Sequence, residues 1–301
     1  MQKSRTFIYG ILLGLLGIVL FSSKAVMVKL AYRYEIDPIS ILLLRMVFSF
    51  PFYLVTLFYV RKKSAVVKTT SKDWIWLAFF GFIGYYLASY FDFIGLVYIK
   101  ASLERIILFV YPTVVLLLNK FFLKQSITKT RVGAIALTYL GIIIAFGNEV
   151  AISGIESLLG GFFVVLSAIT YASYLVGSGW LIPKFGVTRF TSYAMIVSCI
   201  CVFIHYGISM KTSILGYPWQ VYFLGFLIAF FATVIPSFLV SQAIKMINSS
   251  NFAVIAGAGP ISTIILAAIF LGERLTILQF LGAIVVIIGI LLVSLKKQKK
   301  T

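Results

Sequence analysis

Long, almost uninterrupted runs of apolar residues dominate this sequence. Ten runs can be marked: Phe7–Val28, Ile39–Val60, Trp74–Val97, Ile106–Leu123, Val132–Phe146, Leu158–Leu181, Phe190–Ile208, Trp219–Ala243, Phe252–Leu271 and Ile277–Leu295. A helix of roughly 20 residues crosses the hydrocarbon core of a bilayer, and most of these runs reach that length. Only 11% of the residues are charged, against about 25% in soluble domains. The sequence therefore predicts an all-α membrane protein with ten transmembrane helices.

The net charge of +18 is unevenly distributed among the predicted loops. Of the 26 Lys and Arg residues, eighteen fall on the side of the N-terminus, five on the other side and three within the runs. Basic residues accumulate in cytoplasmic loops, so both termini are predicted to be cytoplasmic in a multi-pass protein of the cell (inner) membrane. Because orientation accounts for the charge, we expect no nucleic acid as a partner.

An internal repeat relates the two halves of the chain. Five pairs of identical residues lie 148 positions apart: Pro112 and Pro260, Phe122 and Phe270, Leu123 and Leu271, Thr128 and Thr276, and Gly141 and Gly289. Five helices are an odd number, so the second copy must enter the membrane the opposite way round. The charges agree, since the loop "LKQSITKTR" after the fourth run is basic and its counterpart "LGERLT" is nearly neutral. We expect two inverted five-helix repeats, 1–147 and 158–296, an arrangement common in secondary transporters.

Three stretches carry a resemblance to a known family. They are "FSSKAVMVKLAYRYEIDPISILLLR" (21–45), "FLKQSIT" (122–128) and "FLGERLT" (270–276). With its paired five-helix halves, the chain resembles the EamA-type branch of the drug/metabolite transporter superfamily. The resemblance implies ten helices, a central cavity between the halves and export of amino acids or related small metabolites. The first half departs from the family pattern, because Lys124 and Gln125 replace the Gly-Glu of the motif.

Five charged residues of the first half fall at a similar depth inside the predicted membrane region. They are Lys24, Arg45, Asp92, Glu104 and Arg105, hereafter the charged layer. At 1.5 Å per residue, the last three lie roughly 8–10 Å from the outer end of their helical hairpin. A charge at the bilayer centre costs about 2.5–3.5 kcal/mol on insertion scales. We therefore expect the charged layer to face inward, toward its own members or a wet cavity.

Structural and functional interpretations of the charged layer both remain open at this point. In the structural one, Lys24 snorkels outward, Asp92 pairs with Arg105, and Arg45 binds backbone carbonyls freed at a helix break. In the functional one, the three cations bind a substrate carboxylate, while the two acids balance them, bind an amino group or carry a proton. Arg45 is the preferred ligand, because its own helix offers no acid within one turn and its planar fork suits a carboxylate.

Three tyrosines complete the predicted substrate site: Tyr85, Tyr111 and Tyr171. Each lies near the middle of a predicted span, where a hydroxyl group needs a hydrogen-bonding partner. Tyr85 also shares one helix face with Ser89 and Asp92, at i, i+4 and i+7. We predict that these tyrosines line the central cavity; the alternative is packing between helices.

Motifs for enzymes and ATP-driven pumps are absent from the sequence. The single His205 excludes a histidine-rich metal site, and no Gly-rich phosphate loop precedes a Lys-Ser/Thr pair. We predict a secondary transporter without catalytic residues, metal ligands or cofactor. It would export a small polar metabolite, such as a carboxylate-bearing amino acid or derivative, by alternating access through the central cavity. Its partners would be this substrate and the lipid bilayer. The alternatives are a membrane-embedded enzyme acting on lipid-like substrates and a non-transporting membrane partner protein.

Overall fold

The computed structural model describes residues 2–61, 69–123, 129–209 and 213–294, and these residues form helices and no strand. The first half contains α1 (Gln2–Tyr32), α2 (Pro38–Arg61), α3 (Ser71–Gly81), the π-helix η1 (Phe82–Leu87), α4 (Ala88–Tyr98), α5 (Ala101–Leu108), α6 (Tyr111–Leu123) and α7 (Lys129–Ser153). The second half contains α8 (Glu156–Phe185), α9 (Val187–Ser209), α10 (Trp219–Ala229), the π-helix η2 (Phe230–Val234), α11 (Ile235–Ile255), α12 (Ala258–Leu271) and α13 (Ile277–Ser294). The predicted all-α fold is confirmed.

Helix lengths agree with the predicted number of spans. Eight helical segments of the described chain are long and apolar enough to cross a membrane, and two shorter apolar helices follow at Ala258–Leu271 and Ile277–Gly289. The segment Trp219–Ala253 is interrupted at Asn248, whose φ of 64° is not helical. Asn248 Oδ1 accepts the N–H of Asn251 at 2.9 Å, which is the hydrogen bond of a helix N-cap. A new helix therefore starts at this point, and the ninth span begins there.

Helix boundaries follow the 148-residue repeat more closely than the sequence identities do. Equivalent boundaries lie 148 positions apart at Ser71 and Trp219, Gly81 and Ala229, Phe82 and Phe230, Leu123 and Leu271, and Lys129 and Ile277. The repeat even includes the two π-helices, each of which inserts one wide turn between two α-helices. The two halves thus share one order of helical elements, with α11, which is broken at Asn248, in the place of α4 and α5.

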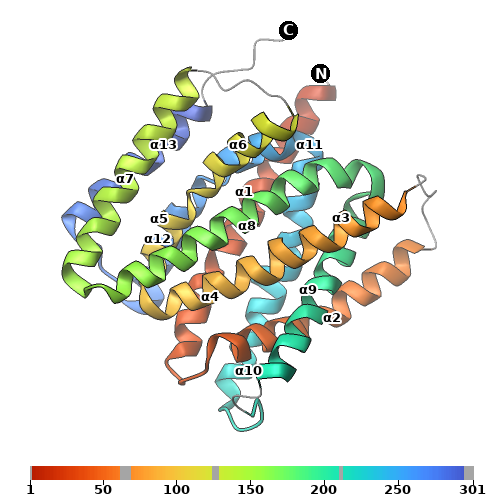
Figure 1. The fold of residues 1–301 in the computed structure, drawn as a ribbon, viewed down its shortest axis with the longest axis horizontal. Helices are drawn as coiled ribbons and strands as arrows, with labels where there is room; N and C mark the ends of the chain where they lie inside the picture. The colour runs from red at the N-terminus through yellow and green to blue at the C-terminus, as the bar shows by residue number, and fades with distance from the viewer. Residues whose placement is uncertain (1, 62–68, 124–128, 210–212, 295–301) are drawn as a thin grey trace.

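The two halves interlock in the bundle. α1 packs against α11 and α12 of the second half, and α7 packs along α13 at one edge of the molecule (Figure 1). Gly141 permits this second contact, because a Cβ atom there would lie 2.6 Å from the carbonyl oxygen of Gly282. α1 begins and α13 ends at the same end of the bundle (Figure 1).

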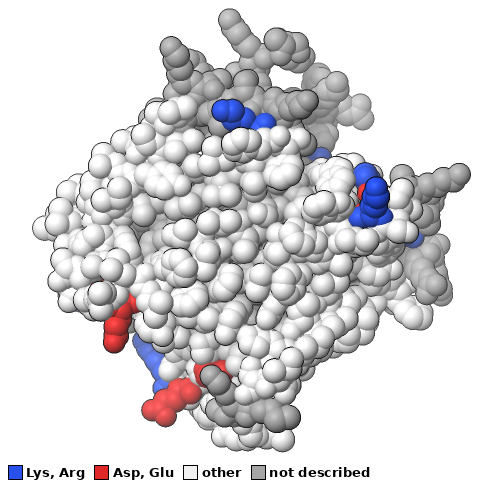
Figure 2. Space-filling view, viewed as in Figure 1, with Lys and Arg blue, Asp and Glu red and all other residues white. Residues whose placement is uncertain are grey.

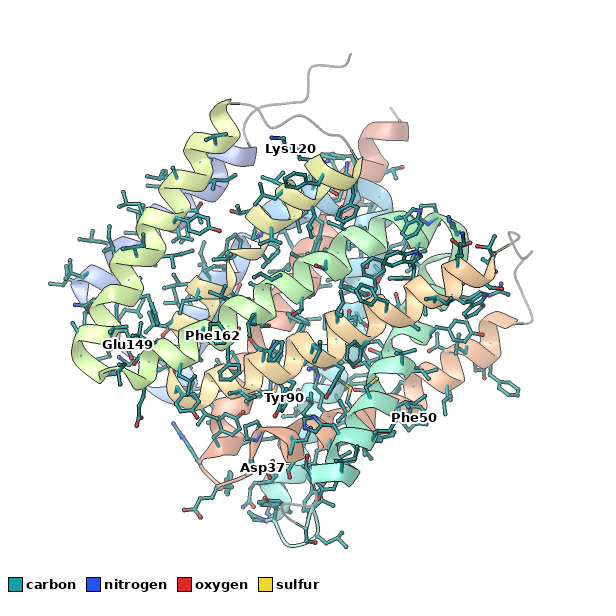
Figure 3. All side chains as sticks on the ribbon, viewed as in Figure 1. Asp37, Phe50, Tyr90, Lys120, Glu149 and Phe162 are labelled. Carbon is teal, nitrogen blue, oxygen red and sulfur yellow. The ribbon has the colours of Figure 1, made fainter. Side chains whose placement is uncertain are left out.

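The surface has the distribution of charge that a lipid environment requires. On the face drawn in Figure 2, a broad band without Lys, Arg, Asp or Glu separates charged side chains at the two ends. Lys120 and Glu149 lie toward opposite ends of the bundle (Figure 3). Large apolar side chains such as Phe58 and Ile143 are exposed, at 76% and 65%. An exposed apolar belt of this kind faces lipid in a membrane protein.

Candidate functional site

The charged layer is buried in the described structure. Lys24 lies on α1, Arg45 on α2, Asp92 on α4, and Glu104 and Arg105 on α5. None of the five residues is more than 5% exposed. The alternative that Lys24 snorkels outward is therefore wrong, because its side chain turns into the bundle and pairs with an acid there.

Lys24 forms the closest ion pair of the charged layer. Its Nζ lies 2.6 Å from Asp92 Oδ2, so the predicted pairing of Asp92 with Arg105 is wrong. Successive residues of an α-helix point about 100° apart, at 3.6 residues per turn. Arg105 consequently turns away from α4: its Nε donates to Thr263 Oγ1 at 3.1 Å and its Nη2 to the carbonyl oxygen of Phe21 at 3.3 Å.

Two acids of the layer face each other. The side chains of Asp92 and Glu104, hereafter the carboxyl pair, are close enough to interact across the α4–α5 turn. Both residues are 0% exposed. Apart from the close approach of Lys24 to Asp92 Oδ2, the described residues donate no hydrogen bond to the four carboxyl oxygens. Arg105 Nε lies 3.7 Å from Glu104 Oε2, at the long end of an ion pair. Two ionised carboxylates in contact repel each other, and a shared proton relieves this repulsion.

Aromatic rings connect the cations, which the sequence did not predict. The Phe21 ring centroid lies 4.8 Å from Lys24 Nζ and 5.9 Å from Arg105 Cζ. The Phe93 ring centroid lies 5.7 Å from Arg45 Cζ and 6.0 Å from Lys24 Nζ. Cations within about 6 Å of a ring are attracted by its quadrupole. The sequence gives one indication of these contacts: Phe21 precedes Lys24 by one helical turn, and Phe93 directly follows Asp92.

Arg45 differs from the other cations in having no acid as a partner. Its Nε donates to Thr233 Oγ1 at 2.7 Å and its Nη1 donates to Ser89 Oγ at 2.8 Å. Its Nη2 has no hydrogen-bond partner among the described residues, although the side chain is 0% exposed. The alternative that Arg45 binds freed backbone carbonyls is therefore wrong, because side-chain hydroxyls take that place. Thr233 belongs to η2, so this arginine also joins the two halves.

The three predicted tyrosines gather into one aromatic cluster. Tyr85 meets Tyr174 edge to face with ring centroids 4.7 Å apart, and Tyr111 meets Tyr171 at 5.4 Å. Tyr171 stacks on Tyr174 at 6.3 Å and on Phe21 at 5.9 Å. The cluster therefore adjoins the charged layer through Phe21, and α8 of the second half supplies two of its rings.

Comparison with known proteins identifies the family. The model of the EamA-like transporter family matches residues 8–147 and again residues 158–295. The chain belongs to the EamA-like transporter family. The resemblance noted in the sequence is thus confirmed, and the chain is a membrane transporter and not an enzyme.

Relatives of this EamA-like transporter include proteins from bacteria and archaea. A Bacillus subtilis protein named "Uncharacterized transporter YcbK" is 33% identical over 287 residues, covering 93% of this chain and 91% of that protein. An Archaeoglobus fulgidus protein named "Uncharacterized transporter" is 24% identical over 209 residues, covering 68% and 71%. A solved crystal structure with 14% identity superposes with a TM-score of 0.69 over 95% of this chain and 96% of that chain. The likeness to the crystal structure shows a shared fold.

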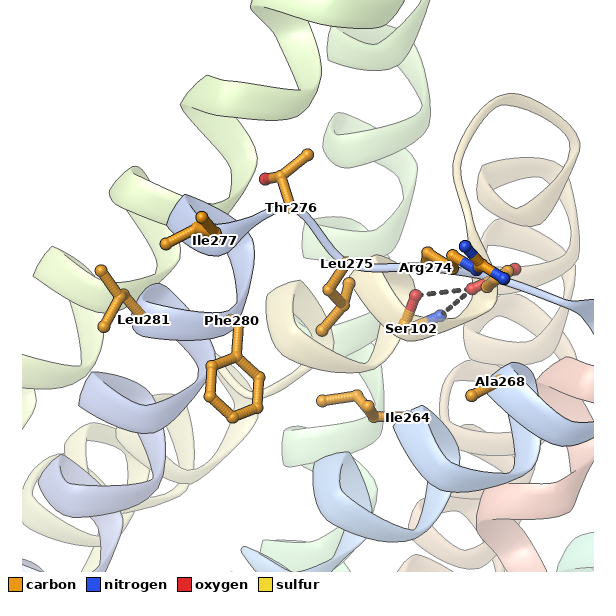
Figure 4. A pocket seen from close by; sticks show the side chains of 10 residues that line it. Ser102, Ile264, Ala268, Arg274, Leu275, Thr276, Ile277, Phe280 and Leu281 are labelled. Atoms are coloured by element: carbon orange, nitrogen blue, oxygen red, sulfur yellow. Dashed lines mark hydrogen bonds between the residues drawn. The ribbon is translucent and has the colours of Figure 1, made fainter.

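Glu273 of the "FLGERLT" stretch links the second half of the EamA-like transporter to the first through hydrogen bonds. Its carboxylate accepts the backbone N–H groups of Ala101 at 2.8 Å and Ser102 at 3.0 Å, and the Ser102 hydroxyl at 2.5 Å (Figure 4). These groups form the N-terminus of α5, where the helix dipole stabilises a negative charge. On the same hairpin, Lys100 pairs with Glu149 at 3.3 Å. The N-terminal end of α5, two residues before Glu104, is therefore bonded to the second half.

Two open pockets of the EamA-like transporter lie apart from this site. One, of about 520 Å³, is bordered by Ser102, the loop after α12 and the start of α13 (Figure 4). The other, of about 540 Å³, lies between α3, α6 and α8 and is rich in aromatic residues. Neither of these two pockets is lined by any of the eight predicted site residues, which are at most 8% exposed. The predicted site is enclosed in this conformation.

Proposed function

We propose that this transporter exports a small polar metabolite that carries a carboxylate, such as an amino acid or a derivative. The observation that carries the proposal is the state of Arg45. Its guanidinium is fully buried and, among the residues that the structure describes, forms no ion pair with an acid and keeps one nitrogen without a hydrogen bond. A buried cation without a counterion is costly unless it is paired and hydrogen-bonded. A substrate carboxylate would supply the missing charge and an acceptor for Nη2.

The charge balance of the layer supports an anionic group on the substrate. Three cations stand against two acids, which leaves one positive charge when both acids are ionised. A proton shared within the carboxyl pair would leave two. We infer that the substrate-binding residues are those of the charged layer and the tyrosine cluster: Lys24, Arg45, Tyr85, Asp92, Glu104, Arg105, Tyr111 and Tyr171.

Alternating access would proceed between the halves 1–147 and 158–296. Both termini would be cytoplasmic in the cell (inner) membrane. The excess of Lys and Arg on the N-terminal side supports this orientation. So does the placement of the start of α1 and the end of α13 at one end of the bundle (Figure 1).

Competition in membrane vesicles tests the carboxylate. The proteinogenic amino acids should be exported. Their methyl esters and the corresponding decarboxylated amines should compete poorly for transport. Arg45→Lys should weaken substrate binding at least tenfold while the protein is expressed at a normal level. A lysine cannot reproduce the two-pronged contact of a guanidinium with a carboxylate. Arg33→Lys is the matched control, because Arg33 is exposed on the outer loop after α1. The proposal is refuted if amines without a carboxylate are carried equally well, or if Arg45→Ala transports at the original rate.

A further inference from the structure

We propose that the carboxyl pair binds one proton and that this proton is exchanged for the substrate in each transport cycle. The inference rests on the proposed function, because it assigns the coupling ion of the same site. Asp92 and Glu104 are the proton ligands. They are held together by the α4–α5 hairpin, whose turn at Ile99 and Lys100 places both acids on facing helices.

Hydrogen bonding around the pair leaves a position for a proton. Glu104 receives no well-oriented donor among the described residues, and both of its oxygens are inaccessible to solvent. The neighbouring Arg105 has directed Nε and Nη2 to Thr263 and to the Phe21 carbonyl. A buried carboxylate that accepts no hydrogen bond is unfavourable. A proton on Glu104 removes its charge and gives it a hydrogen bond to donate to Asp92, which already faces Lys24.

The charged and titratable groups that act on the pair are Lys24 and Tyr32 of α1, Arg45 of α2 and Arg105 of α5 itself. Tyr111 of α6 and Tyr171 of α8 are neighbours of Arg105. α12 contributes the Thr263 hydroxyl, which is bonded to Arg105. Lys24 contacts Asp92 at 2.6 Å, whereas Arg105 approaches Glu104 only to 3.7 Å and directs its hydrogen bonds elsewhere, so Glu104 is the acid with the weaker cationic partner. Glu104 is therefore the acid whose charge a proton or a cationic ligand has to neutralise.

The proposed exchange uses the position of Arg45 and the pair around one ring. The Phe93 ring centroid lies within 6.0 Å of Arg45 Cζ and of Lys24 Nζ, and Lys24 contacts Asp92 of the pair. We infer that the two ends of an amino acid bind at these two subsites. With its carboxylate on Arg45, the ammonium group of the substrate would take the place of the proton between Asp92 and Glu104. The O–H bond of Glu104 breaks, and its proton passes to water on the side to which the site is open. Proton and ammonium compete for one pair, so one leaves when the other binds.

Infrared spectroscopy of the purified protein tests the proton site without a substrate. At neutral pH the wild type should show the C=O stretch of a protonated carboxylic acid, which shifts in D2O and disappears on alkaline titration. The chain has only eight acids, so assignment by substitution is practical. Glu104→Gln and Asp92→Asn should each abolish the band. Glu149→Gln should retain it, because that buried carboxylate accepts hydrogen bonds from Lys100, Ser153 and Gln279. Absence of a titratable band in the wild type, or its persistence in Glu104→Gln and Asp92→Asn, overturns the proposal.

Proteoliposomes with an entrapped pH indicator test the coupling. Efflux of a mixture of the proteinogenic amino acids should drive protons inward in the wild type. Because Glu104 belongs to both the proton site and the substrate site, Glu104→Gln should lower the amino-acid flux and the proton flux together, each at least tenfold. Arg45-dependent transport without proton movement would overturn the proton proposal and leave the carboxylate proposal standing. A titratable band assigned to the pair, together with normal transport by Arg45→Ala, would instead overturn the carboxylate proposal and support the proton site.

Discussion

The ion pair between Lys24 and Asp92 predicts a large coupling between two substitutions. Its atoms are 2.6 Å apart, and the two side chains are 4% and 1% exposed. Removing one partner of such a pair leaves a buried charge without its counterion and typically costs about 3–5 kcal/mol. We expect Lys24→Met and Asp92→Asn each to lower the free energy of unfolding by an amount in this range. The double substitution should cost clearly less than the sum.

The surroundings of the pair make the two single costs unequal. After Asp92→Asn, Lys24 still interacts with Glu104, so the loss should be near the lower end, about 3 kcal/mol. After Lys24→Met, both acids lose the cation that contacts them, and Glu104 keeps only Arg105 at 3.7 Å. That loss should be near the upper end, about 5 kcal/mol. The double variant leaves Glu104 opposite Arg105 with balanced charge, so the coupling should be at least about 2 kcal/mol.

Reversible unfolding in mixed micelles, followed by tryptophan fluorescence, measures these free energies. Lys100→Met with Glu149→Gln is the matched control, since it removes another lysine–carboxylate pair, whose lysine side chain is 34% exposed. A partly exposed pair should show a coupling of at most about 1 kcal/mol. If the effects at Lys24 and Asp92 add to within about 0.5 kcal/mol, the two residues are energetically independent and the reasoning is refuted.

Two further predictions concern the orientation of the chain in the membrane and the contact of Glu273 with the N-terminus of α5. A membrane-impermeant maleimide should label Glu35→Cys but not Lys72→Cys on intact cells, both positions being exposed at helix ends; labelling of Lys72→Cys alone would reverse the orientation. Glu273→Gln should lower the free energy of unfolding by about 1–2 kcal/mol, because the N-terminus of α5 loses a charged acceptor. The exposed Glu156→Gln is its control, and equal effects of the two substitutions would contradict a capping role.

Spans and repeat could be predicted from the sequence because the membrane fixes them. Hydrocarbon thickness sets the length of each apolar run, so the helices fall where the runs are. The π-helices could not be predicted, because one wide turn leaves the apolar composition unchanged. The packing of η1 is close: a Cβ atom on its Gly84 would lie 2.1 Å from Tyr174 Cβ.

The members of the charged layer were predictable, whereas their partners were not. Burying an ion is costly wherever it lies in a span, so residue type and depth suffice to gather the five residues. Pairing depends instead on how each helix is rotated, and a single residue step changes direction by about 100°. Thr233 and Thr263, which bind the two arginines, are ordinary hydroxyl residues in apolar runs and give no sequence signal.

The repeat itself carries no copy of the charged layer. A shift of 148 residues takes Asp92 to Val240, Glu104 to Phe252 and Arg105 to Ala253. In place of charges, the second half contributes the neutral hydroxyl groups of Thr233 and Thr263, which bind the two arginines. Each arginine–threonine hydrogen bond contributes about 1.5–3 kcal/mol and can be exchanged for water or substrate, whereas separating the buried Lys24–Asp92 pair would cost about 3–5 kcal/mol.

Relative motion of the halves should therefore break the contacts to Thr233 and Thr263 and leave the ion pair intact. The charges would then travel as a unit with the first half. Access would alternate as the second half uncovers one side of this unit and then the other. An inverted scaffold can in this way serve both sides of the membrane with a single set of charges.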